Sequence, residues 1–121
     1  MALILFVDDE PLTLTLLSQA AEILGHDSVT TESGQEAVMI AEEQSPEVIL
    51  LDMNLKGTDG VQVTKALREN PKTSEIPILI LSAGPGLQTA ELAAASGANA
   101  YLQKPIRLQT LIEVIREYTE Q

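Results

Sequence analysis

Residues 48–52 read Val-Ile-Leu-Leu-Asp, four apolar residues that end in an acidic one. Two other short apolar runs, residues 2–7 and 78–81, are also followed directly by polar residues. None of the three runs alternates with polar residues, as a strand with one solvent-exposed face does. Continuous Val, Ile and Leu are typical of parallel strands that helices cover on both faces. We therefore predict three buried strands of a parallel sheet.

Helical patterns lie between these strands. Pro11 suits the first position of a helix and Gly25 the position past its end, which predicts a helix over residues 12–24. Ser33 and Glu36 have the spacing of a capping box, which predicts a second helix to about residue 43. Three further helices are predicted over residues 60–70, 87–96 and 108–118, and two weaker strands over residues 28–31 and 100–102. Five strands that alternate with five helices predict an α/β fold in a single domain, residues 1–121.

The composition excludes several classes of protein. Eighteen acidic residues against seven basic ones give a formal net charge of −11, which repels phosphate backbones and anionic lipid surfaces. The sequence has no cysteine and a single histidine, His26, so it cannot form disulfides or the usual zinc sites. No stretch approaches the roughly 20 consecutive apolar residues of a membrane span. We therefore expect a cytoplasmic protein that binds neither nucleic acid nor membranes directly.

Polar residues follow four of the predicted strands. Asp8 and Asp9 follow the first, Asp52 ends the third, Ser82 follows the fourth, and Lys104 follows the fifth. The carboxyl ends of parallel strands meet at one edge of the sheet, where such folds bind ligands. We therefore expect three carboxylates, a hydroxyl and an ammonium group to lie close together.

This set of side chains has a specific chemistry. Three neighbouring carboxylates repel one another unless a proton or cation compensates them, and all-oxygen ligands suit Mg²⁺ or Mn²⁺. Beside such a cation a carboxylate oxygen can attack phosphorus, while Lys104 and Ser82 hold phosphoryl oxygens. The sequence has neither a Walker-type phosphate loop nor a GxGxxG loop, which other phosphate-binding folds require. The set indicates a phosphoryl acceptor.

These residues and their spacing resemble the receiver domains of two-component response regulators, over essentially the whole chain. That family has an acidic pair after the first strand, an aspartate that ends the third, and an Asp-Gly pair seven and eight residues later. It also has Ser or Thr with Ala after the fourth strand and Lys-Pro after the fifth. The matching residues here are Asp8-Asp9, Asp52, Asp59-Gly60, Ser82-Ala83 and Lys104-Pro105.

The resemblance implies a flavodoxin-like, doubly wound sheet with strand order 2-1-3-4-5. It also implies that Asp52 is the phosphorylated residue and receives its phosphoryl group from the phosphohistidine of a sensor histidine kinase or histidine phosphotransfer protein. By the same resemblance Asp9 and Asp52 ligate Mg²⁺ directly, Asp8 helps through water, and Asn54 offers its backbone carbonyl. Lys104 pairs with a phosphoryl oxygen.

The same resemblance implies how phosphorylation is read. Ser82 bonds a phosphoryl oxygen and moves, and Tyr101 turns inward after it. This changes the surface formed by the predicted elements at residues 87–96, 100–102 and 108–118, which a downstream protein target then recognises. The family's activity is confined to adding and removing its own phosphoryl group, without a separate substrate. We expect a monomer or a weak homodimer.

The sequence departs from the family pattern at two loops. Lys56-Gly57 stands where proline is common four residues after the acceptor, and we hypothesise that Lys56 partly offsets the carboxylate repulsion. Gly84, two residues after Ser82, offers no side chain to shield the phosphoryl group from water.

Two other functions are open. One is a degenerate receiver that binds proteins independently of phosphorylation. The other is a small Mg²⁺-dependent phosphatase with an aspartyl nucleophile, although Asn54 stands where such enzymes have a second acid.

Overall fold

Five parallel strands form the main sheet of the computed structural model, which describes residues 2–55, 57–83 and 86–119. The strands are β1 (Leu3–Val7), β2 (Asp27–Thr31), β3 (Val48–Asp52), β6 (Ile78–Ser82) and β7 (Ala100–Gln103). Their order across the sheet is β2-β1-β3-β6-β7. Since β6 and β7 are the fourth and fifth strands of this sheet, the order is the 2-1-3-4-5 order that the family resemblance implies.

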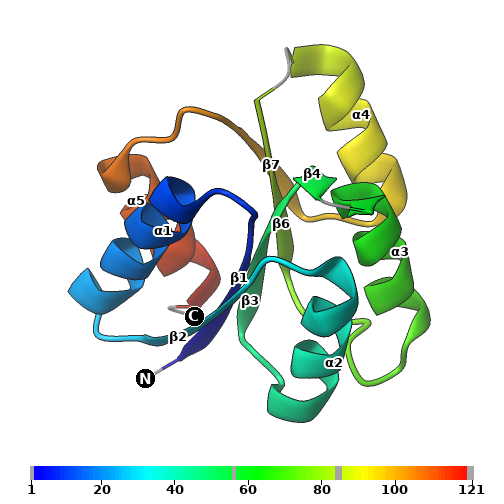
Figure 1. Ribbon diagram of the computed structural model, residues 1–121, viewed down its shortest axis with the longest axis horizontal. Helices are drawn as coiled ribbons and strands as arrows, with labels where there is room; N and C mark the ends of the chain where they lie inside the picture. The colour runs from blue at the N-terminus through cyan, green and yellow to red at the C-terminus, as the bar shows by residue number, and fades with distance from the viewer. Residues whose placement is uncertain (1, 56, 84–85, 120–121) are drawn as a thin grey trace.

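The helices form two layers, one on each face of the sheet (Figure 1). The layer on one face consists of α1 (Pro11–Ile23) and α5 (Leu108–Thr119). The layer on the other face consists of α2 (Gly34–Gln44), α3 (Gly60–Glu69) and α4 (Gly86–Ser96). All five predicted helices and all five predicted strands are confirmed, with ends shifted by about one residue, the usual uncertainty of such boundaries.

The apolar runs pack against both helix layers, as their composition predicts. Alternate residues of a strand point to opposite faces, so Leu5 joins the apolar cluster beneath α2 and α3 while Phe6 joins the one beneath α1 and α5. Every residue of β3 and of β6 is buried. The edge strands β2 and β7 are more exposed, which explains why their sequence signal is weaker.

The helix starts follow the sequence with one difference. The Oγ atom of Ser33 accepts a hydrogen bond from the backbone N–H of Glu36 at 3.2 Å, as the capping box requires. The prediction of a complete box is wrong in its second half, because the backbone N–H of Ser33 donates to Thr31 Oγ1 instead. Thr31 stands two residues before Ser33, so this is a local hydrogen bond from backbone to side chain that competes with the capping box.

A short antiparallel hairpin, β4 (Asn54–Leu55) with β5 (Thr58–Asp59), follows β3 and was not predicted. It leads directly into α3, where a Cβ atom on Gly60 would lie 2.7 Å from the backbone carbonyl oxygen of Asp52. Glycine therefore allows the start of α3 to lie against the end of β3. Among the described residues, no helix is long and apolar enough to cross a membrane.

Candidate functional site

The carboxyl ends of the sheet strands bring the predicted polar residues to one edge. Asp8 follows β1 directly and is fully buried, and Asp52 is the last residue of β3 with 5% of its surface exposed. Ser82, also buried, ends β6, and its backbone carbonyl accepts a hydrogen bond from the Lys104 N–H at 2.7 Å. This bond holds the residue after β7 beside the end of β6, so that the Lys104 side chain can reach the acidic residues.

The Lys104 ammonium group lies among three carboxylates. Its Nζ atom is 2.9 Å from Asp8 Oδ2, 3.0 Å from Glu10 Oε1 and 3.5 Å from Asp52 Oδ1. One oxygen of each carboxylate lies within 4.8 Å of the others. One ammonium cannot neutralise three carboxylates, so the site keeps an excess of negative charge.

This charge distribution shifts the pKa of two groups. Burial, with the nearby Asp8 carboxylate as the second cause, raises the pKa of Asp52 to about 6 from the ordinary value of 3.8, although Lys104 and the Asn54 N–H act in the opposite direction. Burial by itself lowers the pKa of Lys104, but the hydrogen bonds to Asp8 and Glu10 outweigh it and the pKa lies above its ordinary value. Lys104 is therefore a cation at neutral pH, and Asp52 is mostly an anion.

The structure brings some of the predicted site residues together and adds one. Asp8, Asp52 and Lys104 are in contact, whereas Asp9 is half-buried and lies outside the group of three carboxylates. Glu10 provides the third carboxylate of this group, and the sequence did not predict it as a site residue. A glutamate at the N-cap of a helix is unusual, because Ser, Thr, Asp and Asn are preferred there. This unusual residue is the feature of the sequence that could have identified Glu10.

The remaining predicted residues lie around this group. The backbone N–H of Asn54 donates to Asp52 Oδ1 at 3.3 Å. Tyr101 is half-buried in β7 beside a small, mostly alanine-lined hollow of about 80 Å³ between α4 and β7. Lys56 and Gly84, on which the sequence analysis also placed hypotheses, lie outside the described residues.

The donor atoms fit a hard divalent cation. Asp8 and Asp52 supply carboxylate oxygens on neighbouring strands, and Mg²⁺ prefers oxygen ligands while keeping several waters. A buried carboxylate whose pKa is raised also gains from a nearby positive charge. The acidic edge is thus compatible with Mg²⁺, and equally with Mn²⁺.

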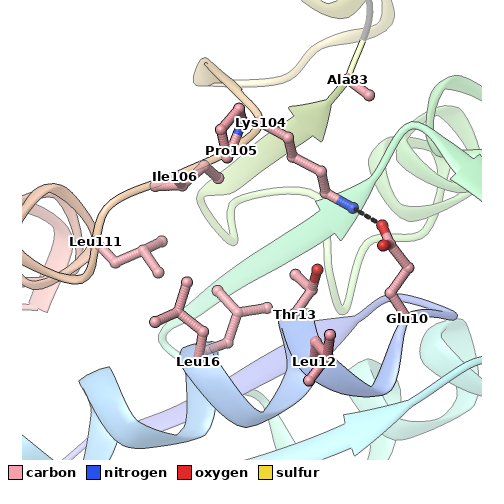
Figure 2. Close-up of a pocket in the computed structure, with 10 residues that line it drawn as sticks. Glu10, Leu12, Thr13, Leu16, Ala83, Lys104, Pro105, Ile106 and Leu111 are labelled. Atoms are coloured by element: carbon pink, nitrogen blue, oxygen red, sulfur yellow. Dashed lines mark hydrogen bonds and ion pairs between the residues drawn. The ribbon is translucent and has the colours of Figure 1, made fainter.

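An open pocket of about 520 Å³ borders the site (Figure 2). Lys104 and Glu10 are its charged lining residues, and the dashed line in Figure 2 marks the ion pair between them. Its apolar lining comes from α1, α5 and the segment that joins β7 to α5, and includes Leu12, Leu16, Leu17, Ile106 and Leu111. Leu12 is 85% exposed, so apolar surface lies open to solvent next to the acidic group.

Comparisons with known proteins agree with this geometry. Residues 4–116 match the response regulator receiver domain. The polar-differentiation response regulator DivK of Brucella ovis is 32% identical over 115 residues, which cover 95% of this chain and 94% of DivK.

Two solved structures extend the comparison. The chemotaxis protein CheY4 of Vibrio cholerae has a TM-score of 0.91 at 28% identity, over 98% of each chain. The receiver domain of the sensor histidine kinase PA1611 of Pseudomonas aeruginosa was solved with a magnesium ion coordinated in its active-site cleft; its TM-score is 0.88 at 29% identity, over 97% of this chain and 96% of that one. A match of sequence, fold and acidic pocket over nearly the whole length shows that this chain belongs to the chemotaxis-like receiver domains of two-component response regulators.

Proposed function

We propose that the chain is a phosphorylation-dependent signalling module in which Asp52 accepts a phosphoryl group from the phosphohistidine of a sensor histidine kinase or histidine phosphotransfer protein. Receiver domains are signalling switches that interact with such donors and with downstream targets. One observation carries the proposal: the buried Asp52 carboxylate lies 3.5 Å from the Lys104 ammonium, in a group of three carboxylates at the carboxyl edge of the sheet.

The reaction is a direct transfer. A carboxylate oxygen of Asp52 forms a bond to phosphorus, the bond between phosphorus and the imidazole nitrogen breaks, and its electron pair stays on that nitrogen. Lys104 stabilises the charge that develops on the phosphoryl oxygens, because its ammonium group already lies close to Asp52. The hydroxyl of Ser82, at the end of the neighbouring strand, bonds another phosphoryl oxygen.

A divalent cation fits the same acidic residues. Asp9 and Asp52 would hold Mg²⁺ directly, with Asp8 acting through water and Asn54 through its backbone carbonyl. The cation would supply positive charge to the phosphoryl oxygens and reduce the repulsion between donor and carboxylates. The excess of negative charge around Lys104 supports a cation at this edge of the sheet, whereas the parts given to Asp9 and Asn54 rest on the family resemblance.

The output is a changed surface. The aspartyl phosphate adds negative charge and acceptor oxygens, which favour one of two pre-existing arrangements. Ser82 and Tyr101 carry the change to the surface of α4, β7 and α5, where a downstream protein binds. Tyr101 is half-buried and lines a hollow of about 80 Å³ between α4 and β7, which supports this route.

Phosphoryl uptake can be measured directly by mass spectrometry of the intact chain. We expect one added phosphoryl group after incubation with acetyl phosphate or phosphoramidate and Mg²⁺, and none with a chelator or in Asp52→Asn. Asp27→Asn makes the same change on an exposed residue of β2 and should take up the group as the natural sequence does.

The alternatives give different results. A degenerate receiver takes no phosphoryl group from either small donor or from a panel of purified histidine kinases. A phosphatase releases many phosphate ions per chain from a phosphomonoester, whereas the proposed module is modified once.

A further inference from the structure

Glu10 occupies an unusual position at the site. It is the N-cap residue of α1, yet its side chain forms no capping hydrogen bond. Instead the carboxylate reaches across to Lys104 Nζ at 3.0 Å, as Figure 2 shows. Its side chain is 61% exposed, so the pair forms at the boundary between the acidic group and solvent. The side chain therefore pairs with Lys104 and does not cap the helix by a hydrogen bond.

The two close partners of Lys104 differ in their freedom to move. Asp8 is fully buried, and its second oxygen, Oδ1, accepts a hydrogen bond from the Glu10 backbone N–H at 2.9 Å. Glu10 is held by Lys104 alone among the contacts described for its carboxylate, and solvent is beside it. When a phosphoryl oxygen takes one of the Lys104 donors, Glu10 is the carboxylate that can leave at small cost.

We propose that Glu10 is an exchangeable counterion that holds Lys104 in the resting state and slows phosphoryl uptake until it is displaced. The proposal rests on the function proposed above and adds a regulatory residue to it. Glu10 acts as a positioning residue through Lys104, and its negative charge also repels the anionic phosphoryl donor. The rate of uptake is thus set in part by a residue outside the acceptor and its metal ligands.

Charge at this distance has a measurable effect on rate. A unit charge about 5 Å from an anionic donor changes a rate roughly fourfold at the dielectric constant of water, and roughly tenfold at a dielectric constant of about 50. Glu10→Gln removes the charge and keeps the length of the side chain. Glu22→Gln is the matched control, because Glu22 is exposed at the far end of the same helix, about 18 Å away at 1.5 Å per residue and beyond the Debye length at 0.15 M salt.

Two measurements test the proposal. The first is the rate of phosphoryl uptake from phosphoramidate at saturating Mg²⁺, followed by intact mass. The second is the rate at which an amine-reactive ester modifies Lys104, measured by peptide mass spectrometry with Lys65 and Lys72 as internal references. We expect Glu10→Gln to take up phosphoryl groups roughly four- to tenfold faster and to be modified faster at Lys104, while Glu22→Gln changes neither rate.

The other results would each overturn the proposal in a distinct way. Equal uptake rates in Glu10→Gln and the natural sequence would make Glu10 a bystander. Slower uptake that needs more Mg²⁺ would make it a metal ligand. If the natural sequence takes up no phosphoryl group from any donor, the proposed function and the counterion role both fail, whereas normal uptake without acceleration in Glu10→Gln removes the counterion role alone.

Discussion

A half-buried cation lies at each end of strands β6 and β7, and the two cations have opposite surroundings. At their carboxyl ends the Lys104 ammonium faces three carboxylates and leaves negative charge uncompensated. At their amino ends the guanidinium of Arg68, from α3, donates to neutral oxygens in every hydrogen bond that it makes with the described residues. The uncompensated negative charge at the carboxyl ends favours binding of a cation or a phosphoryl group. The hydrogen bonds of Arg68 at the amino ends stabilise the folded chain without a ligand.

Arg68 connects three segments at that end. Its Nε atom donates to the Gly97 carbonyl after α4 at 2.9 Å, and Nη1 donates to the Ile76 carbonyl before β6 at 2.7 Å. Its Nη2 atom donates to Asn99 Oδ1 at 2.9 Å, an oxygen that also accepts from the Ile78 N–H. Burial lowers the pKa of Arg68, which Glu75 partly counteracts. The hydrogen bonds of Arg68 thus stabilise the fold at the amino ends of β6 and β7, whereas the candidate functional residues lie at the carboxyl ends of the same strands.

The largest expected change is the loss of stability in Arg68→Met. This variant keeps an apolar side chain of similar reach but leaves several carbonyl groups without their donor, so we expect a loss of about 2–4 kcal/mol in the free energy of unfolding. Urea unfolding measures it, with Arg68→Lys as a control that keeps the charge and loses the fork. The rate of phosphoryl uptake in Arg68→Met should stay within about twofold of that in the natural sequence. A loss of uptake at unchanged stability would contradict the separate roles of the two strand ends.

The second expected change is a gain of stability in Asp52→Asn. At pH 7 the natural carboxylate is ionised in both states and costs the folded state free energy because burial and Asp8 disfavour its charge. A pKa of about 6 in place of 3.8 corresponds to on the order of 2–3 kcal/mol. We expect the amide variant to be more stable by this amount with a chelator present, measured by urea unfolding.

The pH dependence of that gain follows from the raised pKa. As the pH falls through about 6, the folded natural chain binds a proton at Asp52, while the unfolded chain does so only near 3.8. The natural chain thereby recovers stability as the pH falls, and the difference from Asp52→Asn should shrink between pH 7 and 4. Asp27→Asn, measured in parallel, is the control for a general effect of charge. If the stability difference between Asp52→Asn and the natural chain grew as the pH fell, the raised pKa of Asp52 would be contradicted.

The third prediction concerns Mg²⁺ itself. A cation that binds only the folded chain stabilises it by about 1.4 kcal/mol at ten times its dissociation constant. We expect this increment in the natural sequence, the same increment in Arg68→Met, and little or none in Asp52→Asn. Thermal unfolding with Mg²⁺ and with a chelator measures it. Equal increments in all three chains would mean that the cation binds elsewhere.

The smallest expected change is at Thr73, near the Arg68 end. Its hydroxyl is buried and donates to the Leu67 carbonyl at 2.6 Å. Thr73→Val keeps the shape and removes this donor, for an expected loss of about 1 kcal/mol. Urea unfolding detects it, and the Mg²⁺ increment should not change. A shift in the increment would show that the two ends are coupled.

Most of the fold was predictable because its signals are local. Uninterrupted apolar runs at residues 48–51 and 78–81 identified buried parallel strands, and Pro11 and Ser33 marked two of the helix starts that the structure has. The β4–β5 hairpin was missed because its two-residue strands are too short for a periodic pattern. The second half of the capping box was wrong because Thr31, two residues before Ser33, supplied a competing local acceptor.

The site was predictable in its centre and less so at its border. Asp8, Asp52 and Lys104 follow strands whose direction is fixed, so topology alone brings them to one edge. Glu10 was missed because it is the N-cap residue of α1 and not a residue at a strand end, so its contact with Lys104 does not follow from strand direction. That contact depends on how α1 and the segment after β7 face each other.

The sequence by itself determined the layered α/β fold and the strand ends at which the acidic residues and the lysine stand, since both follow from apolar periodicity and chain direction. Only the tertiary structure decided which carboxylates share Lys104, how far burial raises the pKa of Asp52, and that Arg68 is paired with neutral oxygens. The physical reason is that charge interactions depend on distance and solvent exposure between segments distant in sequence. No local pattern records those quantities.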